Sequence, residues 1–227
     1  MTTPKLKAEV KAQGDAFAVT VNGKPLKTPN KKDWVCTSEN LAKAAAEEVE
    51  KHGTKGAFYK LQSFVVDTPA ETTQTEMLDH FDTDLVFYEA DEPVDLVAFQ
   101  KQHWEPVRTW LCDALGGVPF KISHHTTLNE QPKTTHEALE AYLKSLSTEQ
   151  RAVAYFAGRL ASSVAIGLAF AAKELDAEDA HKAGHADEYY QESRYKPDDL
   201  LTERFDENIK QFAQLQIFRD FSYWGID

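Results

Sequence analysis

The first 30 residues carry short apolar runs that alternate with polar positions. Residues 5–12 (KLKAEVKA) and 16–21 (AFAVTV) alternate over the length of a strand, and the turn sequences at 13–15 (QGD) and 22–23 (NG) follow them. Asn-Gly accommodates the positive φ angles that tight primed turns need. The pattern therefore predicts two β-hairpins, with residues 24–28 continuing as a strand or an extended arm.

A helical repeat begins after this arm. Leu41, Ala45 and Val49 recur at helical spacing, and the pattern stops at Gly53. This spacing predicts one helix over residues 38–52. Because its apolar residues lie on one face, we expect the helix to pack on the small sheet.

The next segment is more varied. Residues 60–67 form an apolar, strand-like run, residues 69–81 suit a short helix, and residues 85–88 are apolar again. An acidic turn at residues 89–93 follows. The segment therefore predicts a strand and a short helix before the pattern changes.

Beyond Pro93 the spacing of apolar residues becomes mainly helical. Residues 94–115 predict a helix that ends at the two glycines 116–117. Pro106 lies inside this helix and predicts a break or a kink, because proline has no amide hydrogen to donate. The change of pattern places a domain boundary near Ala90.

The rest of the chain predicts four more helices, over residues 137–145, 148–173, 178–195 and 198–218. Thr134, Ser147 and Asp176 stand where a side-chain oxygen can cap the free amides of a helix start. The helix at 148–173 is apolar nearly all round, which is typical of the centre of a bundle.

These patterns together predict an α+β fold. A small β-rich domain with a packed helix would occupy residues 1–90, and a helical bundle would occupy residues 91–227. Two small domains are compatible with a length of 227 residues.

Composition limits the classes of partner. The chain is 42% hydrophobic and so can form a folded core, and its formal net charge is −12. A negative protein is repelled by phosphate backbones and by anionic lipid. We therefore expect a protein partner, no nucleic acid and no insertion into a membrane.

The longest apolar stretch, Ala152–Ala172, is long enough to span a bilayer, but Arg159 lies inside it and Ala, Ser and Gly dilute it. We expect a buried helix there. Cys36 and Cys112 are too few for a disulfide framework. The N-terminal residues carry no secretion or import signal. These features predict the cytoplasm of a bacterium, or the mitochondrial matrix for a mature organellar chain.

One pair of histidines could bind a metal. His181 and His185 lie four residues apart on a predicted helix, with Asp187 and Glu188 close behind. The pair lacks the glutamate of a zincin motif and an obvious third ligand, so an exposed helix face is the favoured interpretation. A metal-assisted hydrolase using His181, His185 and Glu188 stays open as an alternative.

Other catalytic signatures are missing from the sequence. There is no Gly-x-Ser-x-Gly motif, and neither cysteine lies in a recognisable catalytic context. The spaced glycines that surround a phosphate are missing as well. We therefore predict that the protein is not an enzyme and needs no cofactor.

Residues 186–195 (ADEYYQESRY) combine three tyrosines with acids and an arginine. Tyrosine and arginine are enriched where proteins bind proteins. This composition predicts an interaction surface on the helix at 178–195.

Several motifs along the chain share their pattern with one known family. They are residues 22–29 (NGKPLKTP), 41–49 (LAKAAAEEV), 83–88 (TDLVFY), Gln100 with 104–106 (WEP), and Asp187, Glu188 and Gln191 with Tyr190 where the family has tryptophan. On these motifs the chain resembles the assembly chaperones that bind the alpha subunit of the ATP synthase catalytic head, which occur in mitochondria and alphaproteobacteria.

The resemblance implies a β-rich N-terminal domain, a helical C-terminal domain and a task without catalysis. The task is to hold newly made alpha subunit, and prevent its aggregation, until the beta subunit replaces the chaperone. It also implies that Asp187 and Glu188 contact the partner, with Gln191 beside them. Tyr190 and Arg194 of the same helix complete the predicted partner-binding set. A stable structural subunit of the complex stays open as a further alternative.

Overall fold

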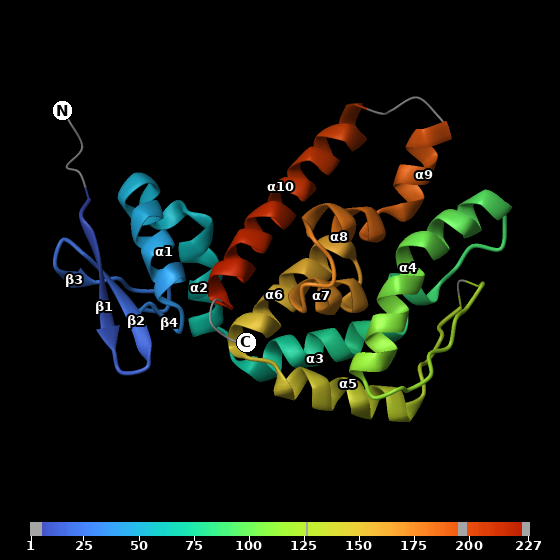
Figure 1. The fold of residues 1–227 in the computed structure, drawn as a ribbon, viewed down its shortest axis with the longest axis horizontal. Coiled ribbons are helices and arrows are strands. Elements are labelled where there is room, and N and C mark those ends of the chain that lie inside the picture. The colour runs from blue at the N-terminus through green and yellow to red at the C-terminus, as the bar shows by residue number, and fades with distance from the viewer. Residues whose placement is uncertain (1–5, 126, 195–198, 224–227) are drawn as a thin grey trace. The chain divides into compact units, whose positions relative to one another are not determined.

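The computed structural model divides into two compact units (Figure 1). Unit 1 comprises residues 1–69 and 217–227, and unit 2 comprises residues 70–216. The residues described are 6–125, 127–194 and 199–223. The boundary expected near Ala90 lies inside unit 2, because Asp84 and Phe87 are buried with the helices of that unit.

Unit 1 is a small antiparallel sheet with helices. Its elements are β1 (Ala8–Gln13), β2 (Ala16–Val21), β3 (Lys24–Pro25), β4 (Val35–Cys36), α1 (Glu39–His52), the 3-10 turn η1 (Gly53–Lys55) and α2 (Ala57–Asp67). Strand β2 pairs with β1, β3 and β4. Gly14, Asn22 and Gly23 all have positive φ angles at the turns, so the two predicted hairpins are confirmed.

Helix α1 is confirmed over nearly the whole predicted range. The Ser38 hydroxyl accepts a hydrogen bond from the amide of Leu41 at its start, and Gly53, with φ of 60°, ends it. Leu41, Ala45 and Val49 are buried and contribute to the core of unit 1, where α1 packs on β1 and β2.

The predicted strand at residues 60–67 is wrong, because this segment belongs to helix α2 and makes up all of it except the first turn. The carboxylate of Glu48 in α1 accepts hydrogen bonds from the amides of Ala57 at 2.7 Å, Phe58 at 3.2 Å and Tyr59 at 3.1 Å. These amides have no partner inside their own helix, so Glu48 stabilises its start. A cap that comes from another helix leaves no signal in the apolar pattern of α2 itself.

Unit 2 is helical. Its elements are α3 (Ala70–His80), the 3-10 turns η2 (Phe81–Thr83) and η3 (Leu85–Phe87), then α4 (Val94–Ala114), α5 (Lys133–Ser145), α6 (Thr148–Ala161), α7 (Val164–Ala171), α8 (Ala177–Gly184), α9 (Ala186–Arg194) and α10 (Asp199–Ser222). Only the part of α10 up to Gln216 belongs to this unit. Tyr195, the expected end of one helix, and Asp198, the expected start of the next, lie outside the described residues.

Helix α4 is confirmed, but the break expected at Pro106 is wrong. The helix continues through Pro106, which lies on an exposed face. The carbonyl of Gln102, which loses its helical donor there, belongs to an exposed residue and can be solvated. Trp104 and Leu111 face the core of unit 2, where they are at most 1% exposed.

The helix predicted over residues 148–173 is interrupted. Ser162 adopts the left-handed conformation with φ of 53°, and Ser163 caps the new helix α7 by accepting a hydrogen bond from the amide of Ile166. Every residue of α7 is buried, so the prediction of a central helix holds for this part. Gly167 allows α6 and α7 to approach closely, since a Cβ atom there would lie 2.3 Å from the carbonyl oxygen of Ala154.

Two of the three predicted caps are present. Ser147 and Gln150 form a reciprocal capping box, and Asp176 accepts from the amide of Asp179. The cap expected at Thr134 is wrong, because α5 begins one residue earlier, directly after Pro132. Among the described residues no helix has both the length and the apolar character needed to cross a bilayer.

Candidate protein-binding site

The five residues predicted to bind a partner lie together on helix α9. Asp187, Tyr190 and Arg194 are spaced three and four residues apart, which puts them on one face of the helix. This face contacts α4, the neighbouring helix (Figure 1). The predicted set is therefore a real cluster in space, and three of its members face another helix of the same unit.

Asp187 is held by a buried glutamine of α4. The side-chain amide of Gln100 donates a hydrogen bond from Nε2 to Oδ1 of Asp187 at 2.7 Å. Gln100 is 2% exposed, whereas Asp187 is half-buried. The oxygen Oε1 of Gln100 accepts a hydrogen bond from the amide of Ala90 at 2.8 Å. Gln100 thus connects the segment before α4 with the first turn of α9.

Asp95 in the first turn of α4 holds the other end of α9. Its carboxylate accepts a hydrogen bond from the hydroxyl of Tyr190 at 2.8 Å and forms an ion pair with Arg194. The guanidinium of Arg194 also lies over the ring of Tyr190, 5.1 Å from its centroid. The side chains of Asp95 and Arg194 are each about half exposed, so this contact is weak and easily exchanged.

The two remaining candidates are more accessible. Glu188 forms a long ion pair of 3.6 Å with Arg204 of α10, and Gln191 is exposed. Asp187 and Glu188 also occupy the first turn of α9, where negative charge interacts favourably with the helix dipole. Four of the five predicted residues therefore have a partner within the chain, and a binding partner would compete with the ion pairs of Glu188 and Arg194.

The histidine pair next to α9 is buried, so the expectation of an exposed helix face is wrong. His181 is 0% exposed and His185 is 8% exposed, and their rings stack with centroids 4.5 Å apart. Nδ1 of His181 lies 3.0 Å from the hydroxyl of Tyr189, and Nδ1 of His185 lies 2.9 Å from the carbonyl oxygen of His181. The pair serves to pack α8 against its neighbours.

The environment of His181 keeps its ring neutral. Burial and the adjacent His185 lower the pKa of His181 to about 4. Phe205 and Phe212 of α10 contact this ring edge-on. Within the described parts of the chain, no three His, Cys, Asp or Glu residues come close enough to hold a metal ion. The geometry therefore gives no support to the metal-assisted hydrolase that uses His181, His185 and Glu188.

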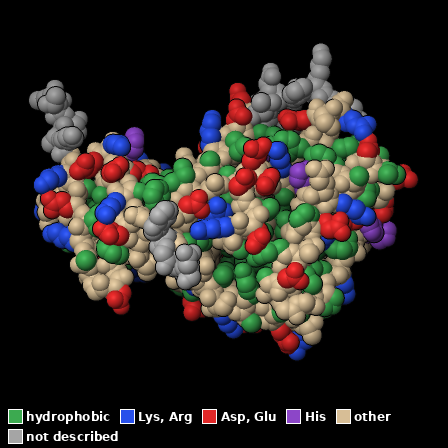
Figure 2. All heavy atoms as spheres, viewed as in Figure 1, with side chains coloured by type: hydrophobic (Ala, Val, Ile, Leu, Met, Phe, Trp, Pro, Cys, Tyr) green, Lys and Arg blue, Asp and Glu red, His purple; other side chains and the backbone are tan. Residues whose placement is uncertain are grey.

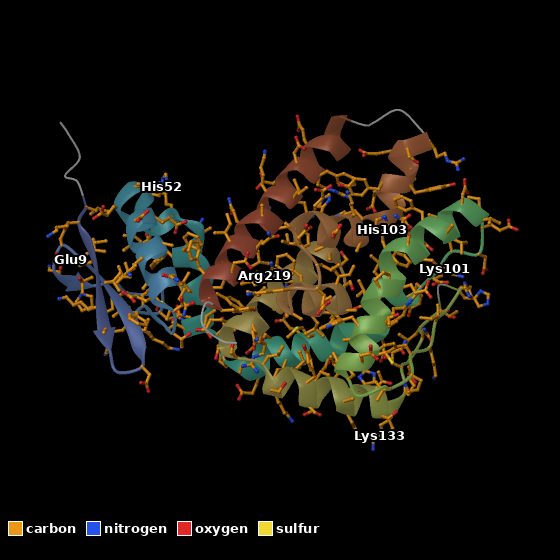
Figure 3. All side chains as sticks on the ribbon, viewed as in Figure 1. Glu9, His52, Lys101, His103, Lys133 and Arg219 are labelled. Atoms are coloured by element: carbon orange, nitrogen blue, oxygen red, sulfur yellow. The ribbon has the colours of Figure 1, made fainter. Side chains whose placement is uncertain are left out.

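Residues of α4 complete the site, and the apolar pattern did not identify them. Asp95 and Gln100 are polar residues of the α4 helix, and Trp104 donates from its indole nitrogen to the carbonyl oxygen of Ala183 at 2.8 Å. His103 lies on α4 near α8, where burial and the positive charge of Lys182 lower its pKa (Figure 3). A polar residue inside an apolar helix stripe, such as Gln100, is the signal that marks this face.

The motif at residues 83–88 has a structural explanation. Asp84 is 1% exposed and accepts hydrogen bonds from the hydroxyl of Ser163 and the amides of Ala165 and Val86. The arm at residues 24–29 is likewise fixed within unit 1, where the hydroxyl of Tyr59 donates to the carbonyl oxygen of Lys27. These contacts give Asp84 and the backbone of Lys27 a role in holding the fold.

A separate cavity of about 400 Å³ lies between α3 and α6 in unit 2. Tyr155 donates a hydrogen bond to Glu76 there at 2.6 Å, and Arg159 lies beside both. Its acidic and basic side chains balance, and none of the predicted partner-binding residues lines it. The cavity is thus a weaker candidate than the α9 cluster.

Charged side chains are mixed over the surface. On the face drawn in Figure 2, Asp and Glu are interspersed with Lys and Arg. The net charge of −12 is therefore not gathered into one continuous patch on that face. On that face a basic partner would meet individual acids and not a broad acidic patch.

The chain matches a protein-family model and several solved structures. The family model of the ATP12 chaperone protein matches residues 5–112. The fold is shared with an aspartate-to-lysine variant of Atp12p from Paracoccus denitrificans, at 23% identity and a TM-score of 0.87, covering 95% of both chains. Atp12 from Paracoccus denitrificans matches at 24% identity and a TM-score of 0.86, covering 95% of this chain and 96% of that one.

A third structure has slightly higher identity. It is a candidate chaperone from Agrobacterium tumefaciens, with 26% identity and a TM-score of 0.83, covering 93% of this chain and 83% of that chain. The predicted α+β fold, with a small sheet followed by helices, is confirmed by these matches and by the structure.

Proposed function

We propose that this chain is an assembly chaperone of the ATP12 type, and that it binds the unassembled alpha subunit of ATP synthase until the beta subunit replaces it. An unassembled subunit exposes a large interface, and such a surface aggregates unless it is covered. A reversible cover needs neither a cofactor nor a chemical step. We assign the protein to the bacterial cytoplasm, or to the mitochondrial matrix if it is organellar.

The half-buried carboxylate of Asp187 is the observation that carries this proposal. One of its oxygens is occupied by Gln100, and among the described residues no hydrogen bond is formed by the other. An oriented carboxylate with an available oxygen can pair with a basic group on a client. Glu188, Tyr190, Gln191 and Arg194 would form the rest of the contact.

The charge of Asp187 can be tested by reversal. In a pull-down of the alpha subunit at moderate salt, we expect Asp187→Lys to lose most of the capture. Asp179→Lys is the matched control, because Asp179 is an exposed acid in the first turn of α8 and undergoes the same change of charge. Equal capture by both variants, or an equal loss in both, would remove Asp187 from the site.

Co-expression tests the chaperone role itself. We expect the alpha subunit to be more soluble with this protein than without it, and less soluble with the Asp187→Lys variant. Purified ATP synthase should then contain none of the protein, since a chaperone leaves when assembly is complete. Its retention at a fixed stoichiometry would support the alternative of a structural subunit.

A further inference from the structure

Gln100 is buried in α4, yet both ends of its side-chain amide are used. The amide of Ala90 donates to Oε1 at 2.8 Å, and Nε2 donates to Asp187 at 2.7 Å. A backbone N–H can meet only the oxygen of the glutamine amide, so the Ala90 contact fixes which end of Gln100 faces α9. The donor end therefore points at the carboxylate of Asp187.

The surroundings make this arrangement rigid. Gln100 is 2% exposed, and one turn later Trp104, 1% exposed, donates to the carbonyl oxygen of Ala183 at the end of α8. The two side chains stand four residues apart on one face of α4. Together they fix the end of α8 and the start of α9, so Asp187 has little freedom to turn away.

We infer that Gln100 is the positioning residue of Asp187: it holds one carboxylate oxygen from inside the protein and keeps the other turned toward a basic group of the client. This inference rests on the proposed function. Preorganising a charged group raises affinity because the client does not have to order it on binding. Gln100 itself is too deeply buried to touch a client.

A double-mutant cycle separates this role from a general effect on packing. Affinity for purified alpha subunit is measured for the full chain, for Gln100→Met, for Asp187→Ala and for the double variant. We expect Gln100→Met to weaken binding about tenfold when Asp187 is present and to change it little when Asp187 is alanine. An equal loss in both backgrounds, or no loss in either, would overturn the inference.

Two further variants guard against a folding artefact. Gln100→Glu keeps the acceptor for Ala90 but replaces the donor that faces Asp187, so we expect it to bind at least as weakly as Gln100→Met. Gln62→Met is the matched control, because Gln62 is 1% exposed and donates to the carbonyl oxygen of Val35 within unit 1. This control should keep the wild-type affinity, and a loss equal to that of Gln100→Met would contradict the assignment.

The same measurements distinguish a failure of the proposed function from a failure of the positioning role of Gln100. If the wild-type chain does not bind the alpha subunit, the proposed function fails, and the role of Gln100 fails with it. If the wild type binds and the cycle shows no coupling between Gln100 and Asp187, only the positioning role is overturned.

Discussion

The carboxylate of Asp84 and the hydroxyl of Ser163 are joined by a buried hydrogen bond of 2.6 Å. The second carboxylate oxygen accepts from the amide of Ala165 at 2.8 Å. The contact ties the turn after α3 to the first residues of α7, which are 79 to 81 residues away in sequence. A loop position that precedes Ala90 is thereby anchored in the core of unit 2.

The burial of Asp84 predicts an unusual dependence of stability on pH. Burial raises the pKa of Asp84 from 3.8 to about 6, although hydrogen bonds from Ser163, Ala165 and Val86 oppose the rise. The native state therefore holds the proton more tightly than the unfolded chain, and the stability from this group falls as pH rises from about 4 to about 6. The change is roughly 3 kcal/mol in the free energy of unfolding.

Urea unfolding of the wild type and of Asp84→Asn between pH 4 and pH 7 tests this. We expect the difference in unfolding free energy between the two proteins to change across that interval and to level off above it. Ser163→Ala should steepen the dependence, because it removes a hydrogen bond that favours the ionised carboxylate. Parallel curves for all three proteins would contradict the prediction.

Buried His181 predicts a pH dependence of stability that has the opposite sign. Its pKa is lowered from 6.5 to about 4 by burial and by His185, so the unfolded chain binds the proton more tightly. Stability from this group is present above pH 6.5 and is lost as pH falls toward 4. In the same unfolding series, His181→Phe should be less sensitive to acid than the wild type, whereas Asp84→Asn should be more sensitive. A shift in the same direction for both variants would refute this assignment.

Elements fixed by nearby residues could be predicted from the sequence. The Asn22-Gly23 turn and the helix start at Ser38 depend on residues within three or four positions, and the structure contains both. Helix α2 depends on Glu48, which belongs to another helix, and the apolar run at residues 60–67 predicts a strand instead. The apolar pattern of a short segment does not register a cap from elsewhere in the fold.

Some features of the candidate site could also be predicted from nearby residues, and others could not. Asp187 and Tyr190 could be found from the composition and motif of one helix. Their contacts with α4 could not, because Gln100, although it belongs to a motif, is 87 residues from Asp187, and Asp95 is 95 residues from Tyr190. The burial of His181 was missed for a related reason, since its cover comes from Phe205 and from other side chains of α10.

The contact between α6 and α7 predicts that Gly167 cannot be replaced by alanine. An added Cβ would lie 2.3 Å from the carbonyl oxygen of Ala154 and 2.7 Å from Cα of Gly158, and both are backbone atoms that cannot move aside alone. We expect Gly167→Ala to lower the free energy of unfolding by about 3 kcal/mol or more.

Gly158→Ala is the matched comparison for this variant. Its added Cβ would lie 3.1 Å from the carbonyl oxygen of Ser163, so the neighbour must give by only a few tenths of an ångström. Chemical denaturation of both variants should show a clearly larger loss for Gly167→Ala. Similar losses would mean that the approach of α6 and α7 is not as tight as the structure has it.

We expect the loss of the Asp95 side chain to change the motion of α9 without a large change in the stability of the protein. Its contacts with Tyr190 and Arg194 are half exposed, so Asp95→Ala should alter the unfolding free energy by less than about 1 kcal/mol. The same contacts hold the end of α9, so amide hydrogen exchange there should become severalfold faster, while exchange in α6 stays unchanged. Asp113→Ala, at an exposed acid in the last turn of α4, should leave the exchange of α9 as it is in the wild type. If Asp95→Ala and Asp113→Ala gave the same exchange profile, α9 would be held without the contribution of Asp95.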